Sequence, residues 1–124
     1  NSFSSVSLSP PLVSWALSLT APSFAVFRRA THFAIHVLKQ EQEQLAHRFA
    51  NAAPDKFDGI DVVDGLGYAP LLPDSLAVFE CRAEFIEYGG DHAIFVGLVE
   101  RIRQQRGMPL VFLRGAYCRL VEAT

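Results

Sequence analysis

The sequence begins with a segment of small polar side chains that could bind an anionic or carbonyl-bearing ligand. Residues 1–7, NSFSSVS, contain Asn1 and four serines, and Pro10-Pro11 separates them from an apolar run at residues 12–19. Hydroxyls and backbone N–H groups can bind phosphate and carbonyl oxygens without a fixed charge when the backbone curls around the ligand. We therefore predict a polar loop that cradles a ligand and leads into a buried strand, although solvated loops often have the same composition.

Other residue combinations do not match a recognised catalytic or metal site. His32 and His36 are four residues apart on an expected strand, where a metal ion would need a third ligand from elsewhere. No serine lies in a nucleophile-elbow motif, and there is no Gly-x-Gly-x-x-Gly fingerprint of a Rossmann nucleotide site. Cys81 and Cys118 form no CxxC motif, so we expect two reduced thiols and no metal site.

Length, composition and charge indicate one soluble domain. The chain has 124 residues, of which 50% are hydrophobic, and a formal net charge of −2. A chain of this length can bury roughly 65% of its unfolded surface. The near-neutral charge argues against a nucleic-acid partner, and no apolar run is long enough to span a membrane. Residues 1–19 have no basic start and contain two adjacent prolines, so we interpret them as folded structure of a cytoplasmic protein.

The hydrophobic pattern predicts a mainly β structure with short helices. These strands and helices should position the polar residues described above. Strands are expected at residues 12–19, 32–38, 76–88, 92–101 and 110–113. A short helix should follow the turn at residues 20–23, and a surface helix should cover residues 40–50. Residues 51–73, rich in Pro, Asp and Gly, should form a long packed connection. A helix-poor meander of this kind fits a small barrel.

Ordered segments along nearly the whole chain resemble those of the flavin reductase family. They are NSFSSVSLSPPLV, HFAIHVL, EQEQLAHRFA, DKF, GLGYAPLL, LAVFECR, GGDHAIFVGLVE and PLVFLRGAYCRL. Members of this family are small split β-barrels that bind FMN or FAD and reduce flavin with NADH or NADPH, often for a partner monooxygenase. The resemblance implies a split β-barrel, a flavin reductase activity, and a homodimer with flavin near the subunit interface.

The resemblance also implies that the flavin ring and ribityl chain lie between the first segment and the strand at residues 32–38. By position it assigns flavin contacts to Asn1, Ser2, Phe3, Ser4, Ser5, Val6, Ser7, Phe33, Ala34, Ile35, His36 and Val37. Backbone donors would stabilise the charge that builds near flavin N1, O2 and N5 on reduction. Phe33, Ile35 and Val37 could equally be core residues. His36 stands where relatives commonly have asparagine, and Ser9 where they often have an acidic residue.

Further residues are assigned to the phosphate, adenine and nicotinamide groups by the same resemblance. Lys56 and Phe57 match a pair near the flavin phosphate, where a cation is a suitable point charge. Thr20 and Ser23 are candidates for the phosphate or the adenine half of FAD. His92 is expected to position the nicotinamide and not to donate protons, and Tyr117 is a second candidate for the same pocket. The arginines that could distinguish NADPH from NADH, or remain solvated, are Arg28, Arg29, Arg101, Arg103 and Arg106.

Several alternatives remain open from the sequence. Relatives usually begin with further strands before the NSF motif, and the resemblance implies that these are absent from this chain, which would uncover a barrel edge. We regard residues 1–124 as one flavin-binding domain. The alternative function is a non-catalytic flavin- or haem-binding split barrel that acts as a carrier or sensor. The choice between FMN and FAD, the choice between NADH and NADPH, and the identity of a partner monooxygenase do not follow from the residues.

Overall fold

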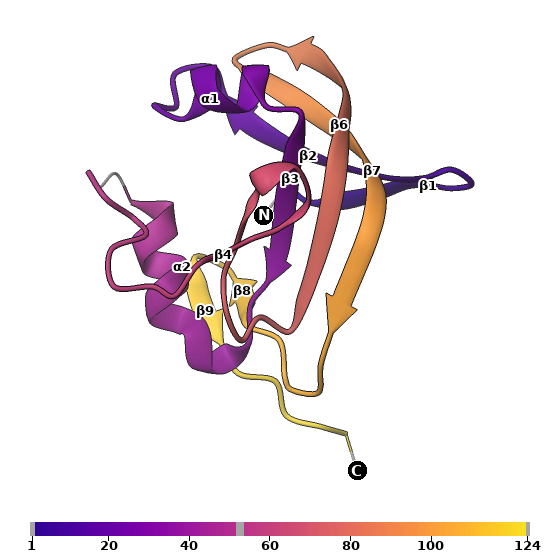
Figure 1. Ribbon diagram of the computed structural model, residues 1–124. Helices are drawn as coiled ribbons and strands as arrows, with labels where there is room; N and C mark the ends of the chain where they lie inside the picture. Colours follow the sequence, from indigo (N-terminus) through magenta and orange to yellow (C-terminus); the bar gives the residue numbers. More distant parts are fainter. Residues whose placement is uncertain (1, 52–53, 124) are drawn as a thin grey trace.

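The main feature of the fold is one antiparallel sheet (Figure 1). The computed structural model describes residues 2–51 and 54–123. The five strands of the sheet lie in the order β1-β2-β7-β6-β3. They are β1 (Ser4–Leu8), β2 (Pro11–Ser18), β3 (His32–Val37), β6 (Ala77–Gly89) and β7 (His92–Gln104). Two separate ribbons are β4 (Val63–Asp64) with β5 (Pro70–Leu71), and β8 (Val111–Leu113) with β9 (Ala116–Cys118). The helices are α1 (Phe24–Arg29) and α2 (Glu43–Ala50), with 3₁₀ turns η1 (Gln40–Gln42) and η2 (Leu66–Tyr68). The prediction of a mainly β fold with short helices is confirmed.

Alternating side chains place one face of the sheet against the hydrophobic core. The buried core residues, contributed by β2, β3, β6 and β7, are Val13, Phe33, Cys81, Ala93 and Phe95. Because successive side chains of a strand point to opposite faces, apolar residues two apart meet on this side. Trp15 lies opposite Phe95 in the β2–β7 register, and their rings stack with centroids 4.6 Å apart. Helix α1 closes this end of the sheet, where Phe27 meets the Trp15 ring edge to face at 4.8 Å.

The two cysteines belong to the fold and not to a reactive site. Both Cys81 and Cys118 are free. Burial raises the pKa of the Cys81 thiol to about 11, so this side chain packs as a small apolar group.

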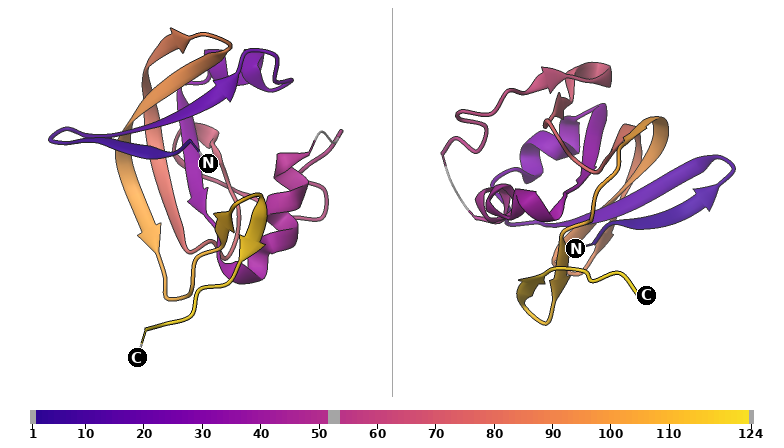
Figure 2. Two further views of the ribbon diagram at one scale, coloured as in Figure 1. Left: turned by 180° about the vertical axis from the view of Figure 1, so that it is seen from behind. Right: turned by 90° about the horizontal axis from the view of Figure 1, so that it is seen from below.

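The serine-rich segment forms an edge strand, so the prediction of a polar loop at residues 1–7 is wrong. Strand β1 pairs antiparallel with β2, and Ser4 lies opposite Ser14. The Ser2 hydroxyl accepts a hydrogen bond from the Ala16 N–H at 2.8 Å and donates to the Ala16 carbonyl at 3.2 Å. Serine tolerates this extended conformation because its hydroxyl bonds the neighbouring backbone. The β1–β2 hairpin projects from the body of the protein in both views of Figure 2.

Strand β2 and several element boundaries also differ from the sequence-based expectations. We expected residues 12–19 to be buried on both faces, but within β2 only Val13 is buried, because one neighbour of β2 is the exposed edge strand β1. The helix expected at residues 40–50 divides into η1 and α2. Strand β7 continues beyond the expected end at residue 101, and β8 turns at Arg114 into β9.

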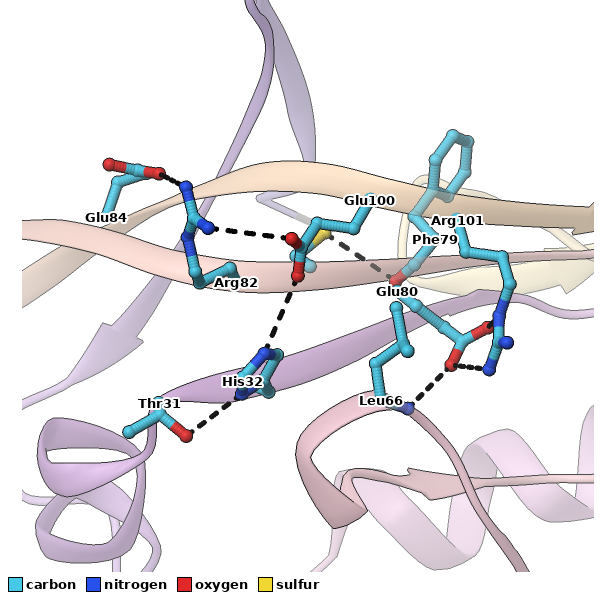
Figure 3. Close-up of polar contacts among 10 residues, drawn as sticks. Thr31, His32, Leu66, Phe79, Glu80, Arg82, Glu84, Glu100 and Arg101 are labelled. Carbon is cyan, nitrogen blue, oxygen red and sulfur yellow. Dashed lines mark hydrogen bonds and ion pairs between the residues drawn. The ribbon is translucent and has the colours of Figure 1, made fainter.

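The long connection between α2 and β6 packs against the sheet at residues 65–72, which we call the wall segment. Its residues Ala69 and Leu71 are 6% and 4% exposed. One attachment runs through Glu80, a β6 residue that is only 1% exposed. A Glu80 carboxylate oxygen accepts the N–H of Leu66 at 2.9 Å (Figure 3). A Cβ at Gly65 would lie 2.6 Å from that carboxylate, so only glycine permits this approach.

Two arginines of β7 neutralise the buried Glu80 carboxylate. Arg101 forms a two-pronged contact with both carboxylate oxygens, of which Nη2 to Oε1 is 2.7 Å, and Arg103 Nε lies 3.6 Å from Oε2. Hydrogen bonding from Arg101 outweighs the opposing effect of burial and lowers the pKa of Glu80 from 4.5 to about 2. The wall segment is therefore held to the sheet by a carboxylate that stays charged even in moderately acidic solution.

Replacing Glu80 should destabilise the protein in a pH-dependent way. Because the pKa of Glu80 is lowered in the folded chain, its contribution is complete above about pH 4.5 and disappears as the pH falls towards 2. We expect Glu80→Gln to reduce the free energy of unfolding at neutral pH by roughly 2 to 3 kcal/mol, as measured by urea denaturation. The control is Glu84→Gln, which removes an exposed pair with Arg82 and should cost less than about 1 kcal/mol. Equal losses in both variants would contradict the structural role of Glu80.

Candidate functional site

A cavity of about 700 Å³ lies between β3, α1, α2 and the wall segment. Its lining includes Ser23, Val26, Phe27 and Arg29 from α1 and the residue before it, His32, Phe33, Ala34 and His36 from β3, Phe49 and Phe57 from α2 and the following loop, and residues 67–70 and 72 of the wall segment. Three separate stretches of the sequence, residues 23–36, Phe49 with Phe57, and residues 67–72, thus contribute to one space. Five residues assigned to the flavin by the resemblance lie in this lining, namely Ser23, Phe33, Ala34, His36 and Phe57.

The two faces of strand β3 have different surroundings. Phe33 is 4% exposed and is part of the core, where it packs so closely on Gly97 that a Cβ there would lie 2.4 Å from the ring. Ile35 packs against the same core, and neither Ile35 nor Val37 lines the cavity. Phe33 therefore belongs to the core and also reaches the cavity lining, Ile35 belongs to the core, and Ala34 and His36 line the cavity from the opposite face of β3.

His36 holds a second attachment of the wall segment. Its Nε2 accepts the N–H of Leu72 at 3.0 Å, although 36 residues separate the two in sequence. Burial lowers the pKa of His36, opposed by a backbone hydrogen bond at Ala34 and by the negative charge of Glu80. The imidazole is therefore neutral near pH 7, and the acceptor role of Nε2 assigns the proton to Nδ1. His36 thus positions one side of the cavity.

The first segment approaches β3 from the core side and does not reach the cavity. The Phe3 ring lies 5.3 Å from the ring of Phe79, a residue that pairs with Ile35 of β3. The remaining candidates of this segment, Ser2, Ser4, Ser5, Val6 and Ser7, lie along or just before the exposed edge strand β1. Asn1 lies outside the described residues. The structure therefore brings the start of this segment near β3, but not its serine side chains into the cavity.

The cation that the cavity offers is not the one assigned from the sequence. Lys56 Nζ donates to the carbonyl of Phe49 at 3.0 Å, and so binds the last turn of α2. Its neighbour Phe57 does line the cavity, in edge-to-face contact with Phe49 at 5.1 Å. Among the described lining residues, Arg29 is the one with a permanent charge. The sequence analysis gives Arg29 as one of five arginines that could distinguish NADPH from NADH or remain solvated, because nothing in its local pattern shows which way the last turn of α1 faces.

His92 and Thr20 lie together at the end of the sheet that α1 covers, outside the cavity lining. His92 pairs with Ser18 across β7 and β2, and the Ser18 hydroxyl lies 3.0 Å from that of Thr20. His92 Nδ1 lies 2.7 Å from a carboxylate oxygen of Asp91, and this hydrogen bond lowers the pKa of Asp91. The carboxylate fixes the ring orientation and leaves Nε2 as the free edge of the imidazole.

Tyr117 does not share a pocket with His92 within one chain, contrary to the sequence-based expectation. It lies on β9, where its ring meets His47 of α2 at 4.9 Å and Phe112 at 5.1 Å. Figure 1 shows β9 beside α2, at the end of the molecule away from the β6–β7 turn that carries His92. The two residues are separated because the β8–β9 ribbon leaves the main sheet after β7.

The chemistry of the cavity suits a flat aromatic molecule with an anionic group. Aromatic rings and aliphatic side chains provide most of the surface, while Arg29 and the Ser23 hydroxyl provide polar contacts. Among residues 2–51 and 54–123, no three His, Cys, Asp or Glu side chains gather as a metal ion would require. Within the same ranges, no helix has the length and apolar character needed to cross a membrane.

Comparison with known proteins gives consistent matches over the whole chain. The family model described as "Flavin reductase like domain" matches residues 1–121. FMN reductase (NADH) SmoA of Agrobacterium fabrum is 44% identical over 119 residues, which are 96% of this chain and 68% of the relative. The reductase subunit HsaB of a flavin-dependent monooxygenase from Rhodococcus jostii is 40% identical and is covered over 60% of its length. The structure of the NADH:FAD oxidoreductase SgcE6 of Streptomyces globisporus superimposes with a TM-score of 0.94 at 36% identity, covering 100% of this chain and 77% of that one.

The stability of the protein should fall on acidification through His36. Because burial lowers the pKa of His36 in the folded chain, the unfolded chain takes up a proton that the folded chain resists. This contribution is complete above the unfolded pKa of about 6.5 and is lost below it. His36→Asn keeps an acceptor for the Leu72 N–H. We expect its melting temperature to fall less between about pH 7 and pH 5 than that of the native chain. An unchanged slope in His36→Asn would contradict the assignment.

Proposed function

The chain belongs to the flavin reductase like domain family, and on that premise we propose that it transfers hydride from NADH or NADPH to FMN or FAD. The observation that carries the proposal is the cavity beside β3, where residues from four of the family-like segments meet in one aromatic, Arg29-containing space. The chain spans 68% and 60% of the two curated relatives described above, so the activity of the whole protein is part of the proposal.

The lining of the cavity fits a flavin nucleotide. A flavin bound there would supply an acceptor for hydride at its N5 atom. Arg29 and the Ser23 hydroxyl provide a cation and a donor for its phosphate, and the aromatic side chains exclude water from the ring. Ala34 and His36 also line the space, where His36 is a neutral hydrogen-bonding group because burial lowers its pKa. The described residues therefore bind and orient, and none of them needs to transfer a proton.

His92 is proposed to position the nicotinamide ring. Its side chain is 49% exposed, and Asp91 orients the imidazole so that Nε2 faces outward. Hydride transfer between two cofactors depends mainly on close approach in the right orientation, which a fixed imidazole can enforce by hydrogen bonding or stacking.

We propose that the protein acts as a homodimer with flavin near the subunit interface. In one chain His92 lies outside the cavity lining, and a second copy could complete the nicotinamide side. The projecting β1–β2 hairpin carries Val6 and Leu8, which are 53% and 93% exposed, and large apolar side chains of this kind commonly mark an interface. A partner monooxygenase is the proposed user of the reduced flavin, since relatives are named as reductase components of such enzymes.

Anaerobic spectroscopy tests the proposed reaction directly. The purified protein is mixed with FMN or FAD, and then with NADH or NADPH, while the long-wavelength flavin band is followed. We expect the band to bleach over many turnovers with at least one nucleotide. If flavin binds but neither nucleotide bleaches it, the carrier or sensor function replaces the reductase.

Removing the His92 imidazole should slow hydride transfer without weakening flavin binding. Because a small misplacement of the donor lowers the rate steeply, we expect His92→Ala to reduce the anaerobic reduction rate about 100-fold, measured by stopped-flow absorbance. The control is His47→Ala, which removes another exposed histidine and should leave the rate unchanged. A native rate in His92→Ala would remove this residue from the proposed nicotinamide site.

A further inference from the structure

Tyr68 combines an unusual backbone conformation with an exposed position in the cavity lining. Its φ is +64°, in the left-handed region that bulky side chains rarely adopt. Its side chain is 83% exposed and lines the cavity beside β3. Asp74 and Arg114 also have positive φ, but both lie in turns away from this cavity lining. Tyr68 is therefore a large aromatic residue held in a strained conformation at a ligand-sized space.

The local turn favours glycine at the position that Tyr68 occupies. The Ala69 N–H donates to the Leu66 carbonyl at 3.2 Å, and the two residues between them, Gly67 and Tyr68, both have positive φ. This is the pattern of a type I′ turn, whose central positions are dominated by Gly, Asn and Asp. The turn itself therefore gives no reason for a tyrosine, and strained residues of this kind cluster at ligand-binding sites.

The rest of the wall segment keeps this turn in place. Leu66 is bonded to Glu80 of β6, and Leu72 is bonded to His36 of β3. Between these attachments Gly67 lies directly on the His32 ring, because a Cβ at Gly67 would be 2.1 Å from Nδ1. The Tyr68 ring is thus held beside the cavity by its backbone and not by packing of its own side chain.

The cavity lining that includes Tyr68 offers apolar surface on which a purine base can stack. Val26 and Phe57, two other lining residues, are 62% and 41% exposed and offer only apolar surface. Stacking on a base needs only an aromatic face. Arg29 in the same lining offers the charge that a pyrophosphate requires.

We propose that Tyr68 stacks on the adenine ring of FAD while Arg29 binds the pyrophosphate, so that the cavity prefers FAD to FMN. This inference rests on the proposed function, because it assumes that the cavity holds the flavin nucleotide. It adds a specificity-determining residue and selects one of the two flavins.

Replacing Tyr68 by glycine separates binding from folding. Glycine removes the ring and also suits the positive φ, so Tyr68→Gly should melt no lower than the native chain. Affinities for FAD and FMN are measured by quenching of Trp15, the single tryptophan, whose ring contacts the lining residue Phe27. We expect FAD affinity to fall by roughly 5- to 100-fold, as loss of one stacked base implies, while FMN affinity changes less than about twofold.

Tyr68→Phe should retain native FAD affinity. Tyr88→Ala, which removes an exposed tyrosine of β6, should change neither affinity.

The outcomes distinguish this inference from the proposed function. Equal losses of FAD and FMN affinity, or no loss of either, would overturn the adenine role of Tyr68 even if both flavins are reduced. If Tyr68→Gly does not fold, competition by AMP decides the question. AMP should displace FAD from the native protein, and failure to displace it would overturn the inference. If neither flavin binds the native protein, the proposed function itself fails.

Discussion

One of the two attachments of residues 65–72 to the sheet depends on a buried carboxylate. Glu80 lies within β6, where an uncompensated charge would be strongly destabilising, and the guanidinium of Arg101 and the Leu66 N–H together satisfy it. The same contacts determine where the chain can pass, since only a glycine at residue 65 fits against the carboxylate. Without this ion pair the wall segment would keep only the attachment of Leu72 to His36, and the side of the cavity that it forms would be less firmly held.

The cavity is an assembly of short segments around a rigid sheet. The sheet is long and regular, with β6 and β7 paired from Ala77 opposite Gln104 to Gly89 opposite His92. The elements that surround the cavity are a six-residue α1, an eight-residue α2 and the wall segment. Short helices of this kind have little stability of their own. Their positions come from contacts with the sheet, such as that of Phe27 with Trp15, so the geometry of the cavity follows from the core.

Sequence patterns predicted most of the strands and the family, but fewer of the residues that line the cavity. Alternation along residues 76–88 identified β6 because apolar and polar positions there differ clearly. Residues 4–8 show no such difference between apolar and polar positions, since serine occurs on both faces of the strand. Their sequence pattern therefore predicts a loop where the structure has an edge strand. Lys56 was assigned by motif, yet its ammonium group binds a helix carbonyl, and Arg29 supplies the cavity cation. Neither result could be read from the residues, because both depend on how α1 and α2 are oriented on the sheet.

Attachment through backbone N–H groups has an evolutionary consequence for the wall segment. Leu66 and Leu72 are fixed through their main chains, so the contacts with Glu80 and His36 do not depend on the side chains at these positions. Substitutions at exposed positions between them, above all at residue 68, alter the ligand surface and leave the anchoring groups intact. The segment can therefore accumulate changes in ligand preference at little cost to folding. Such a division between anchoring groups and exposed surface would allow one barrel to accept different ligands without a change in its fold.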